Sequence, residues 1–293
     1  FNEDNVINQL KDVDAIGLRT SKINSKILQN CKNLKIVSRH GVGYDNVDLD
    51  FLNSNNQALA ITGTSNAVSV AEHVMTMFLY LAKRINKSDK LVREGNFKNK
   101  RSLGNFFELY KKNILILGFG RIGQAVAKRC YGFESNILIY DPYVDRQYIE
   151  NHNYRKIDLD EGINLADFIT IHMPINKETK NLISIEKFNL MKKECIIVNT
   201  ARGGIINEKD LASSLINKQI YGAGLDVYEN EPPIKNDPLF KLENIILTPH
   251  NAALTLECRK RMAVEMAENI TNYLDGETNL NKDNIVNRKI LNL

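Results

Sequence analysis

Three glycines and a later aspartate have the spacing of a site that holds a dinucleotide. Gly118, Gly120 and Gly123 follow an apolar run, and Asp141 closes a second apolar run about 20 residues later. The first glycine allows a tight turn, the second lets the backbone approach a pyrophosphate, and the third lets the next helix pack closely on the sheet. The N-terminus of that helix offers unpaired amides and partial positive charge. The motif predicts cofactor contacts from Gly118, Gly120, Arg121, Ile122 and Gly123.

The place of Asp141 at the end of a predicted strand favours NAD as the cofactor. There its carboxylate can accept hydrogen bonds from the ribose hydroxyls. A 2'-phosphate would need a cation beside it, and Pro142 and Tyr143 supply none. Arg146 is close enough in the sequence to keep NADP open as an alternative.

Three later segments each end a predicted strand with an ionisable side chain. Arg202 follows Thr200, Glu231 follows a strand that ends near Asp226, and His250 lies in Thr248-Pro249-His250-Asn251. Ligands of open parallel sheets bind at the carboxyl ends of the strands. An arginine, a carboxylate and a histidine are therefore expected to converge at one edge of the sheet.

The elements that must position these groups alternate between apolar strands and helices. Strand-like runs are predicted at 13–18, 34–38, 58–62, 114–117, 137–140, 168–171, 196–199, 222–226 and 245–247. Such alternation predicts an α/β fold with a mostly parallel, doubly wound sheet. Ser69 and Glu72 have capping-box spacing, and they predict the start of a helix that runs to about Arg84.

The polar stretch 86–112 is expected to be a solvent-facing crossover, and a final amphipathic helix ends near Gly276. We expect residues 85–254 to form the cofactor domain. That domain would be inserted into a smaller domain made of residues 1–84 and 255–293.

Composition narrows the functional classes. The chain has 293 residues, 43% of them hydrophobic, and a net charge of +4 from interspersed charges, which argues against a nucleic-acid partner. No apolar stretch approaches the roughly 20 residues that span a bilayer, and the first residues lack signal-peptide order, so we expect a soluble, cytoplasmic protein without a membrane partner. The four cysteines form no CxxC, and no residue group has metal-ligand spacing, so no metal is expected.

With these motifs, and with His40-Gly41-Val42-Gly43-Tyr44-Asp45-Asn46-Val47-Asp48, the sequence resembles the D-isomer-specific 2-hydroxyacid dehydrogenase family over nearly its whole length. The similarity is to its phosphoglycerate dehydrogenase-like and glyoxylate/hydroxypyruvate reductase-like members of the short, catalytic-core type. It implies NAD-dependent hydride transfer to a small 2-oxo acid, with a Rossmann domain inserted into a flavodoxin-like, substrate-binding α/β domain and catalysis in the cleft between them. By the same resemblance, a leading strand and a serine-feedback domain are absent from this sequence, which begins without Met.

The resemblance implies roles for three residues: Arg202 binds substrate, Glu231 is the partner carboxylate, and His250 is the acid/base. Reduction of a 2-oxo acid leaves negative charge on the carbonyl oxygen, and His is suited to protonate it near neutrality. Glu231 would hydrogen-bond the other imidazole nitrogen, which fixes the tautomer and favours the protonated form. The planar fork of Arg202 suits a carboxylate better than an ammonium does.

Further contacts are also implied by the resemblance. The amides of Val42 and Gly43 would form an anion nest for the substrate carboxylate, although a plain glycine turn is the alternative. Asp226 would accept from the nicotinamide carboxamide, and the loop of His172 and Pro174 would lie over the cofactor, as would Thr200. His40 could meet the substrate. For His73 and His152 we expect surface or packing roles.

Some alternatives stay open. Superfamily members that act as NAD-sensing transcriptional corepressors retain the same Arg, Glu and His, so the motifs alone do not exclude a binding protein. Formate-type members carry an amide where this chain has Glu231, which favours hydroxyacid chemistry here. Glyoxylate, hydroxypyruvate, 3-phosphoglycerate and a bulkier acid all remain as substrates. The resemblance also implies a homodimer formed through the cofactor domain.

Overall fold

The computed structural model describes residues 3–276 and 280–293, and the chain divides into two compact units. Phe1–Asn66 and Leu254–Leu293 form the first unit, and Ala67–Ala253 form the second. The division lies before helix α4 (Ala67–Ala82), whereas the sequence led us to place it after residue 84. Helix α4 packs against the sheet of the second unit through buried side chains such as Val74, Met77 and Phe78, and for that reason it belongs there.

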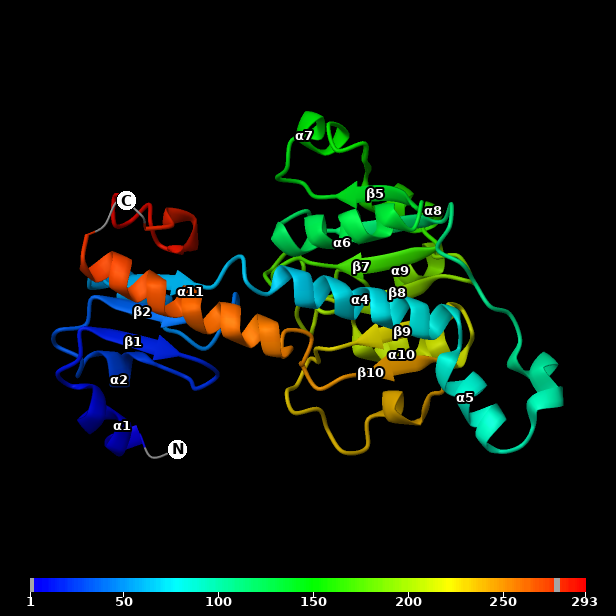
Figure 1. The fold of residues 1–293 in the computed structure, drawn as a ribbon, viewed down its shortest axis with the longest axis horizontal. Helices are drawn as coiled ribbons and strands as arrows, with labels where there is room; N and C mark the ends of the chain where they lie inside the picture. The colour runs from blue at the N-terminus through cyan, green and yellow to red at the C-terminus, as the bar shows by residue number, and fades with distance from the viewer. Residues whose placement is uncertain (1–2, 277–279) are drawn as a thin grey trace. The chain divides into compact units, whose positions relative to one another are not determined.

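A seven-stranded parallel sheet forms the centre of the second unit (Figure 1). Its strands are β4 (Asn113–Leu117), β5 (Asn136–Tyr140), β6 (Arg155–Lys156), β7 (Phe168–Ile171), β8 (Ile196–Asn199), β9 (Gly222–Leu225) and β10 (Ile245–Leu247). Their order is β10-β9-β8-β7-β4-β5-β6, and every pairing is parallel. The chain enters the sheet at β4, continues through β5 to β6 at one edge, and then returns to β7, from which β8, β9 and β10 build the other half. This confirms the predicted Rossmann sheet and places its topological switch point between β4 and β7.

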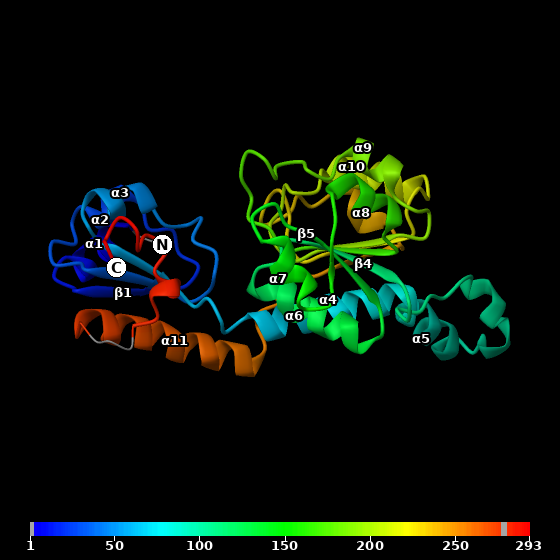
Figure 2. The ribbon, with the colours of Figure 1, turned by 90° about the horizontal axis from the view of Figure 1, so that it is seen from above.

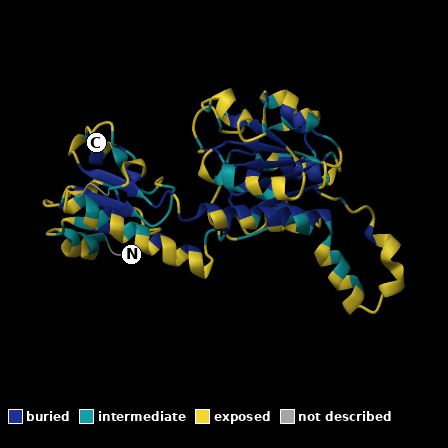
Figure 3. Ribbon diagram, turned by 45° about the horizontal axis from the view of Figure 1, so that its top comes forward, coloured by how far each residue is buried: buried dark blue, intermediate teal, exposed yellow. Residues whose placement is uncertain are grey.

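Helices cover both faces of this sheet. The face with Ile114 and Ile116 packs against α4 and α6 (Arg121–Gly132). The opposite face, with Leu115 and Leu117, is covered by α8 (Leu159–Leu165), α9 (Ile185–Leu190) and α10 (Glu208–Ile216). Central strands buried on both sides explain the continuous apolar runs in the sequence, and they are dark in Figure 3.

One expectation for the segment before β4 needs correction. Helix α4 begins at Ala67, so Ser69 lies inside it, and its hydroxyl donates to the carbonyl oxygen of Ala252 at 2.7 Å instead of capping the helix. The predicted capping box is therefore wrong. The polar stretch after α4 contains α5 (Ile85–Arg93) and the 3₁₀ helix η1 (Phe97–Leu103), which extend away from the sheet (Figure 2).

The first unit is a smaller α/β layer around a parallel sheet in the order β1-β2-β3. The strands are β1 (Ala15–Leu18), β2 (Ile36–Arg39) and β3 (Ala58–Ile61). One face packs against α1 (Glu3–Leu10), α2 (Ser25–Leu28) and α3 (Leu49–Ser54), and the other against the long helix α11 (Leu256–Leu274). Within the described ranges, no helix combines the length and the apolar character needed to cross a bilayer.

The remaining elements are short and lie in connections. They are α7 (Arg146–Glu150), η2 (Pro238–Lys241) and η3 (Lys282–Asn284).

Candidate active site

The glycine loop between β4 and α6 has the geometry that a dinucleotide needs. Gly118 has a φ of +95°, and a Cβ there would lie 2.6 Å from the carbonyl oxygen of His172. A Cβ on Gly123 would lie 2.1 Å from the carbonyl oxygen of Gly118. A Cβ on Gly120, by contrast, would meet none of the described atoms within 4 Å. The chain itself requires two glycines, and the third leaves open space beside the N-terminus of a 12-residue helix, which fits a pyrophosphate.

Asp141 directly follows β5, and its carboxylate forms hydrogen bonds with two loops. Its Oδ2 accepts from the amide of Phe119 at 2.8 Å, and its Oδ1 accepts from the amides of Tyr143 and Val144 at 2.9 and 3.2 Å. The carboxylate therefore joins the turn after β5 to the glycine loop. The sequence did not predict this local function, which comes in addition to the ribose contact expected of Asp141.

In the second unit, three buried polar atoms at the carboxyl ends of strands lack a hydrogen-bond partner among the residues that the structure describes. They are His172 Nδ1 after β7, Thr200 Oγ1 after β8 and Asn251 Oδ1 in the loop after β10. Nearly all buried polar atoms in folded proteins are hydrogen-bonded, so these atoms are suited to a polar ligand. Together with the open space at Gly120, they fit NAD.

The ring of His172 is held in its neutral form. Its Nε2 lies 2.9 Å from Thr170 Oγ1, and burial lowers the pKa of His172 to about 3. Pro174 follows in the same loop and is exposed. A neutral imidazole can hydrogen-bond a cofactor without adding charge to the site.

The segment after β8 places Arg202 next to the segment after β9. The buried Asn199 donates from Nδ2 to the carbonyl oxygen of Arg202 at 2.8 Å, and its Oδ1 accepts from the amide of Ala201 at 3.0 Å. Arg202 Nη1 donates to the carbonyl oxygen of Ala201 at 2.7 Å. A Cβ on Gly203 would lie 1.8 Å from the carbonyl oxygen of Tyr228, so the two segments meet backbone to backbone.

His250 and Glu231 form a direct pair, as expected from the sequence. His250 Nδ1 lies 2.8 Å from Glu231 Oε2, and Glu231 Oε1 accepts from the amide of Tyr228 at 3.2 Å. The two side chains are 51% and 39% exposed. In the described part of the chain His250 Nε2 has no hydrogen-bond partner, so an imidazole braced by a carboxylate presents its second nitrogen to solvent. Such a group can give or take a proton.

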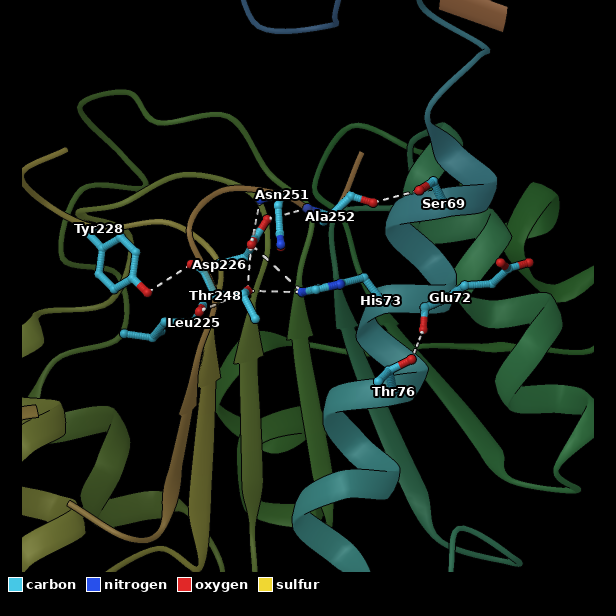
Figure 4. A network of polar contacts seen from close by, with 10 residues as sticks. All are labelled: Ser69, Glu72, His73, Thr76, Leu225, Asp226, Tyr228, Thr248, Asn251 and Ala252. Atoms are coloured by element: carbon cyan, nitrogen blue, oxygen red, sulfur yellow. Dashed lines mark hydrogen bonds and ion pairs between the residues drawn. The ribbon is translucent and has the colours of Figure 1, made fainter. Parts of the chain in front are cut away.

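The backbone of His250 is unusual, because its φ is +51°. A left-handed conformation costs roughly 1–2 kcal/mol for a residue other than glycine, and it persists where neighbouring contacts hold it. Asp226 supplies such contacts: its Oδ1 accepts from the amide of Asn251 at 2.9 Å and from Thr248 Oγ1 at 2.6 Å, and its Oδ2 accepts from the amide of Ala252 at 2.9 Å (Figure 4). Both sides of His250 are thus tied to one buried carboxylate.

Asp226 therefore has a structural function in the loop that carries His250. This function comes in addition to the contact with the nicotinamide carboxamide that is expected from the sequence. Tyr228 holds the same loop from another side, since its hydroxyl donates to the carbonyl oxygen of Thr248 at 2.9 Å. The partners are 20 to 26 residues apart in the chain, and no short motif identified them.

Val42 and Gly43 lie in the first unit, directly after β2. Arg39 Nε donates to the carbonyl oxygen of Gly43 at 2.7 Å, and Gly41 has a φ of +148°. The amides of Val42 and Gly43 have no backbone partner in the residues described. Two successive open amides fit the expected anion nest. His40 Nε2 lies 3.3 Å from the carbonyl oxygen of Arg259 in the same unit.

Glu208 is an acidic residue that the sequence did not single out. Its Oε1 accepts from the amide of Glu229 at 2.6 Å, and Glu229 Oε1 accepts from the amide of Glu208 at 3.1 Å. Burial raises the pKa of Glu208 to about 7, and the neighbouring carboxylates of Glu229, Asp237 and Glu231 add to this increase. The described residues contain no group of three or more His, Cys, Asp or Glu side chains placed to hold a metal ion.

Comparison with known proteins gives consistent results. Residues 75–252 match the model of the D-isomer specific 2-hydroxyacid dehydrogenase, NAD binding domain. The chain is 37% identical over 277 residues to D-3-phosphoglycerate dehydrogenase of Archaeoglobus fulgidus, covering 94% of this chain and 52% of that protein. It is 37% identical over 297 residues to glyoxylate reductase of Pyrococcus furiosus, covering 97% of this chain and 87% of that protein.

Among solved structures, D-lactate dehydrogenase from Aquifex aeolicus complexed with NAD and lactic acid superposes with a TM-score of 0.86. It is 28% identical in sequence, and the match covers 96% of this chain and 88% of that one. The chain spans about half the length of the D-3-phosphoglycerate dehydrogenases it matches and most of the length of the glyoxylate reductases. The chain therefore belongs to the D-isomer specific 2-hydroxyacid dehydrogenase family and contains its NAD-binding domain.

Proposed function

We propose that the chain is an NAD-dependent oxidoreductase acting on the CH–OH group of a small D-2-hydroxy acid. The observation that carries the proposal is the 2.8 Å contact between His250 Nδ1 and Glu231 Oε2. This pair follows strands of the same parallel sheet whose glycine loop leaves open space at Gly120. The residues proposed for proton transfer and for cofactor binding therefore lie at the same edge of one sheet.

The proposed chemistry assigns one role to each ionisable group. Bound NADH would supply a hydride to the carbonyl carbon of the 2-oxo acid. His250 Nε2 gives a proton to the carbonyl oxygen, while Nδ1–H donates to Glu231 and keeps the ring in the orientation that presents Nε2. Arg202 binds the substrate carboxylate and polarises the adjacent carbonyl. In the direction of oxidation His250 takes the proton back.

The proposed cofactor contacts follow from the loops at the strand ends. The pyrophosphate would be held by the glycine loop, namely Gly118, Gly120, Arg121, Ile122 and Gly123. Asp141 would accept from the ribose, which favours NAD over NADP. His172, Pro174, Thr200 and Asp226 complete the proposed set, supported by the unpartnered Nδ1 of His172 and Oγ1 of Thr200.

The proposed substrate is a small 2-oxo or 2-hydroxy acid. Its carboxylate would be recognised by Arg202 and by the amides of Val42 and Gly43. The curated relatives named above suggest 3-phosphoglycerate and glyoxylate as candidates, and the family resemblance of the sequence adds hydroxypyruvate.

Turnover measurements test the proposal. The purified chain is assayed for NADH consumption with glyoxylate, hydroxypyruvate and phosphohydroxypyruvate, and in the reverse direction with 3-phosphoglycerate and NAD. We expect turnover with at least one acid and lower activity with NADPH. A protein that binds NADH yet turns over none of these acids would contradict the proposal and favour the NAD-sensing binding protein considered above.

We further propose a cytoplasmic homodimer. The segment between α4 and β4, residues 83–112, exposes large apolar side chains that a second copy of the chain could cover. They are Ile85, Val92, Phe97, Phe106 and Tyr110. All four cysteines are free thiols, which suits a reducing compartment. Light scattering of the purified chain measures the mass directly, and a monomer at all concentrations would contradict the dimer.

A further inference from the structure

We infer that His73 is a positioning residue for the loop that carries His250, acting through Thr248 and Asp226. This inference rests on the function proposed for His250. From the sequence alone we expected a surface or packing role for His73. In the structure it projects from α4 toward the end of β10, and His73 Nε2 lies 3.0 Å from Thr248 Oγ1 and 3.8 Å from Asp226 Oδ1 (Figure 4).

The proton count at Thr248 fixes the direction of these hydrogen bonds. The hydroxyl has one proton, and its shortest contact, 2.6 Å, is to the carboxylate Oδ1 of Asp226, which can only accept. The carbonyl oxygen of Leu225 is a second acceptor at the longer distance of 3.5 Å. The hydroxyl therefore donates to Asp226, and toward His73 it must accept. It follows that His73 Nε2 carries a proton and donates to Thr248 Oγ1.

The N–H donor of His73 matters because Asp226, which accepts from Thr248, is a buried carboxylate. The side chain of Asp226 is 1% exposed, and a buried carboxylate is stable only where donors or a positive charge compensate it. Its donors from the His250 loop are the Thr248 hydroxyl and the amides of Asn251 and Ala252. Among the described residues, His73 is the basic side chain within 4.0 Å of this carboxylate.

The consequence reaches His250 through its backbone. The same carboxylate holds residues on both sides of His250, whose φ of +51° needs such support. Without the donor at position 73, the oxygen of the Thr248 hydroxyl loses the hydrogen bond that it accepts, and the buried carboxylate loses its nearest basic group. The loop then samples other conformations, and His250 spends less time in contact with Glu231.

Three variants separate this role from a general packing effect. His73→Leu removes the donor and retains apolar bulk. His73→Gln keeps an N–H donor, because its Nε2 is three bonds from Cβ, as is the Nε2 of histidine. Thr76→Ala is the matched control on the same helix, since the Thr76 hydroxyl donates to the carbonyl oxygen of Glu72, one turn earlier.

Amide hydrogen exchange of the protein without added cofactor gives the first readout. We expect the amides of Asn251 and Ala252 to exchange about 10-fold faster in His73→Leu, the factor that corresponds to losing one hydrogen bond in a charged network. His73→Gln should restore most of the protection, and Thr76→Ala should leave it unchanged. Steady-state kinetics give the second readout: kcat should fall by about 10-fold in His73→Leu while KM for NADH stays the same, with recovery in His73→Gln.

Specific results would overturn the inference. Unchanged exchange of the Asn251 and Ala252 amides in His73→Leu would show that His73 does not hold the loop. A His73→Gln variant that folds like wild type but exchanges and turns over like His73→Leu would refute the donor role. If wild type turns over no 2-oxo acid, the proposed function fails, whereas the exchange experiment still decides the role of His73.

Discussion

The different surroundings of Gly120 and Gly123 allow cofactor binding to be separated from folding by one added methyl group. In Gly120→Ala, the new Cβ meets no described atom within 4 Å, and the φ of −71° is allowed for alanine. Alanine is a poorer N-cap residue than glycine by about 1 kcal/mol at most, and it restricts the unfolded chain by about 0.4–1 kcal/mol in the opposite direction. The free energy of unfolding should therefore change by less than about 1 kcal/mol.

Cofactor affinity should respond much more strongly. The methyl group would occupy the space in which a pyrophosphate approaches the helix N-terminus, so that hydrogen bonds to a charged group are lost or lengthened. Such bonds contribute about 1.5–3 kcal/mol, which corresponds to an increase of about 10- to 150-fold in the Kd for NADH. Fluorescence titration with NADH measures this change, and thermal unfolding measures stability in the same sample.

Gly123→Ala is the matched control for folding. Its Cβ would lie 2.1 Å from the carbonyl oxygen of Gly118, so the backbone must move, at a cost of about 1–3 kcal/mol or more. We expect a lower unfolding temperature for this variant only. Wild-type NADH affinity in Gly120→Ala would refute the pyrophosphate assignment, and wild-type stability in Gly123→Ala would refute the close packing of the loop.

Two more predictions concern carboxylates of the same unit. Asp141→Ala should weaken NADH binding and relax the cofactor preference toward NADPH. It should also lower the free energy of unfolding by about 1–3 kcal/mol, because three backbone amides lose their acceptor. Titrations with both cofactors and urea unfolding measure these effects, and an unchanged cofactor preference would remove Asp141 from the ribose site. Burial raises the pKa of Glu208 from 4.5 in the unfolded chain to about 7 in the folded protein. Between these two values the folded protein keeps a proton that the unfolded chain has released, so the free energy of unfolding falls as the pH rises from about 4.5 to about 7. Glu208→Gln should reduce the stability difference between pH 5 and pH 8 by about 1–2 kcal/mol, after allowance for the partial solvent exposure of this side chain. An identical pH dependence of urea unfolding in both proteins would contradict this prediction.

The sequence predicted the parts of the fold that depend on local pattern. The strands Phe168–Ile171, Ile196–Asn199 and Ile245–Leu247 have the predicted bounds, because a buried parallel strand is a continuous apolar run with polar ends. The strand Arg155–Lys156 was missed, since two polar residues at a sheet edge carry no such pattern. The pairing of His250 with Glu231 followed from the family resemblance, and the structure brings these side chains together.

Contacts between residues far apart in the chain could not be predicted from the sequence. Ser69 looked like a helix cap, yet its partner Ala252 is 183 residues away. His73 similarly contacts Thr248 across 175 residues. For Asp226 the sequence predicted a cofactor contact, and only the folded backbone shows that its carboxylate also accepts from the amides of Asn251 and Ala252. Hydrogen bonds of this kind depend on how strand ends meet at the sheet edge, which residue types and spacing do not specify.

The proposed function depends above all on His250 as the group that supplies the proton when a 2-oxo acid is reduced. The most direct test compares wild type with His250→Ala in the NADH-dependent reduction of the best acid of the panel, with NADH affinity measured alongside. We expect kcat to fall by about two to four orders of magnitude, the usual effect of removing a general acid, while the Kd for NADH is unchanged. Undiminished turnover in His250→Ala would show that another group donates the proton and would refute the role proposed for His250.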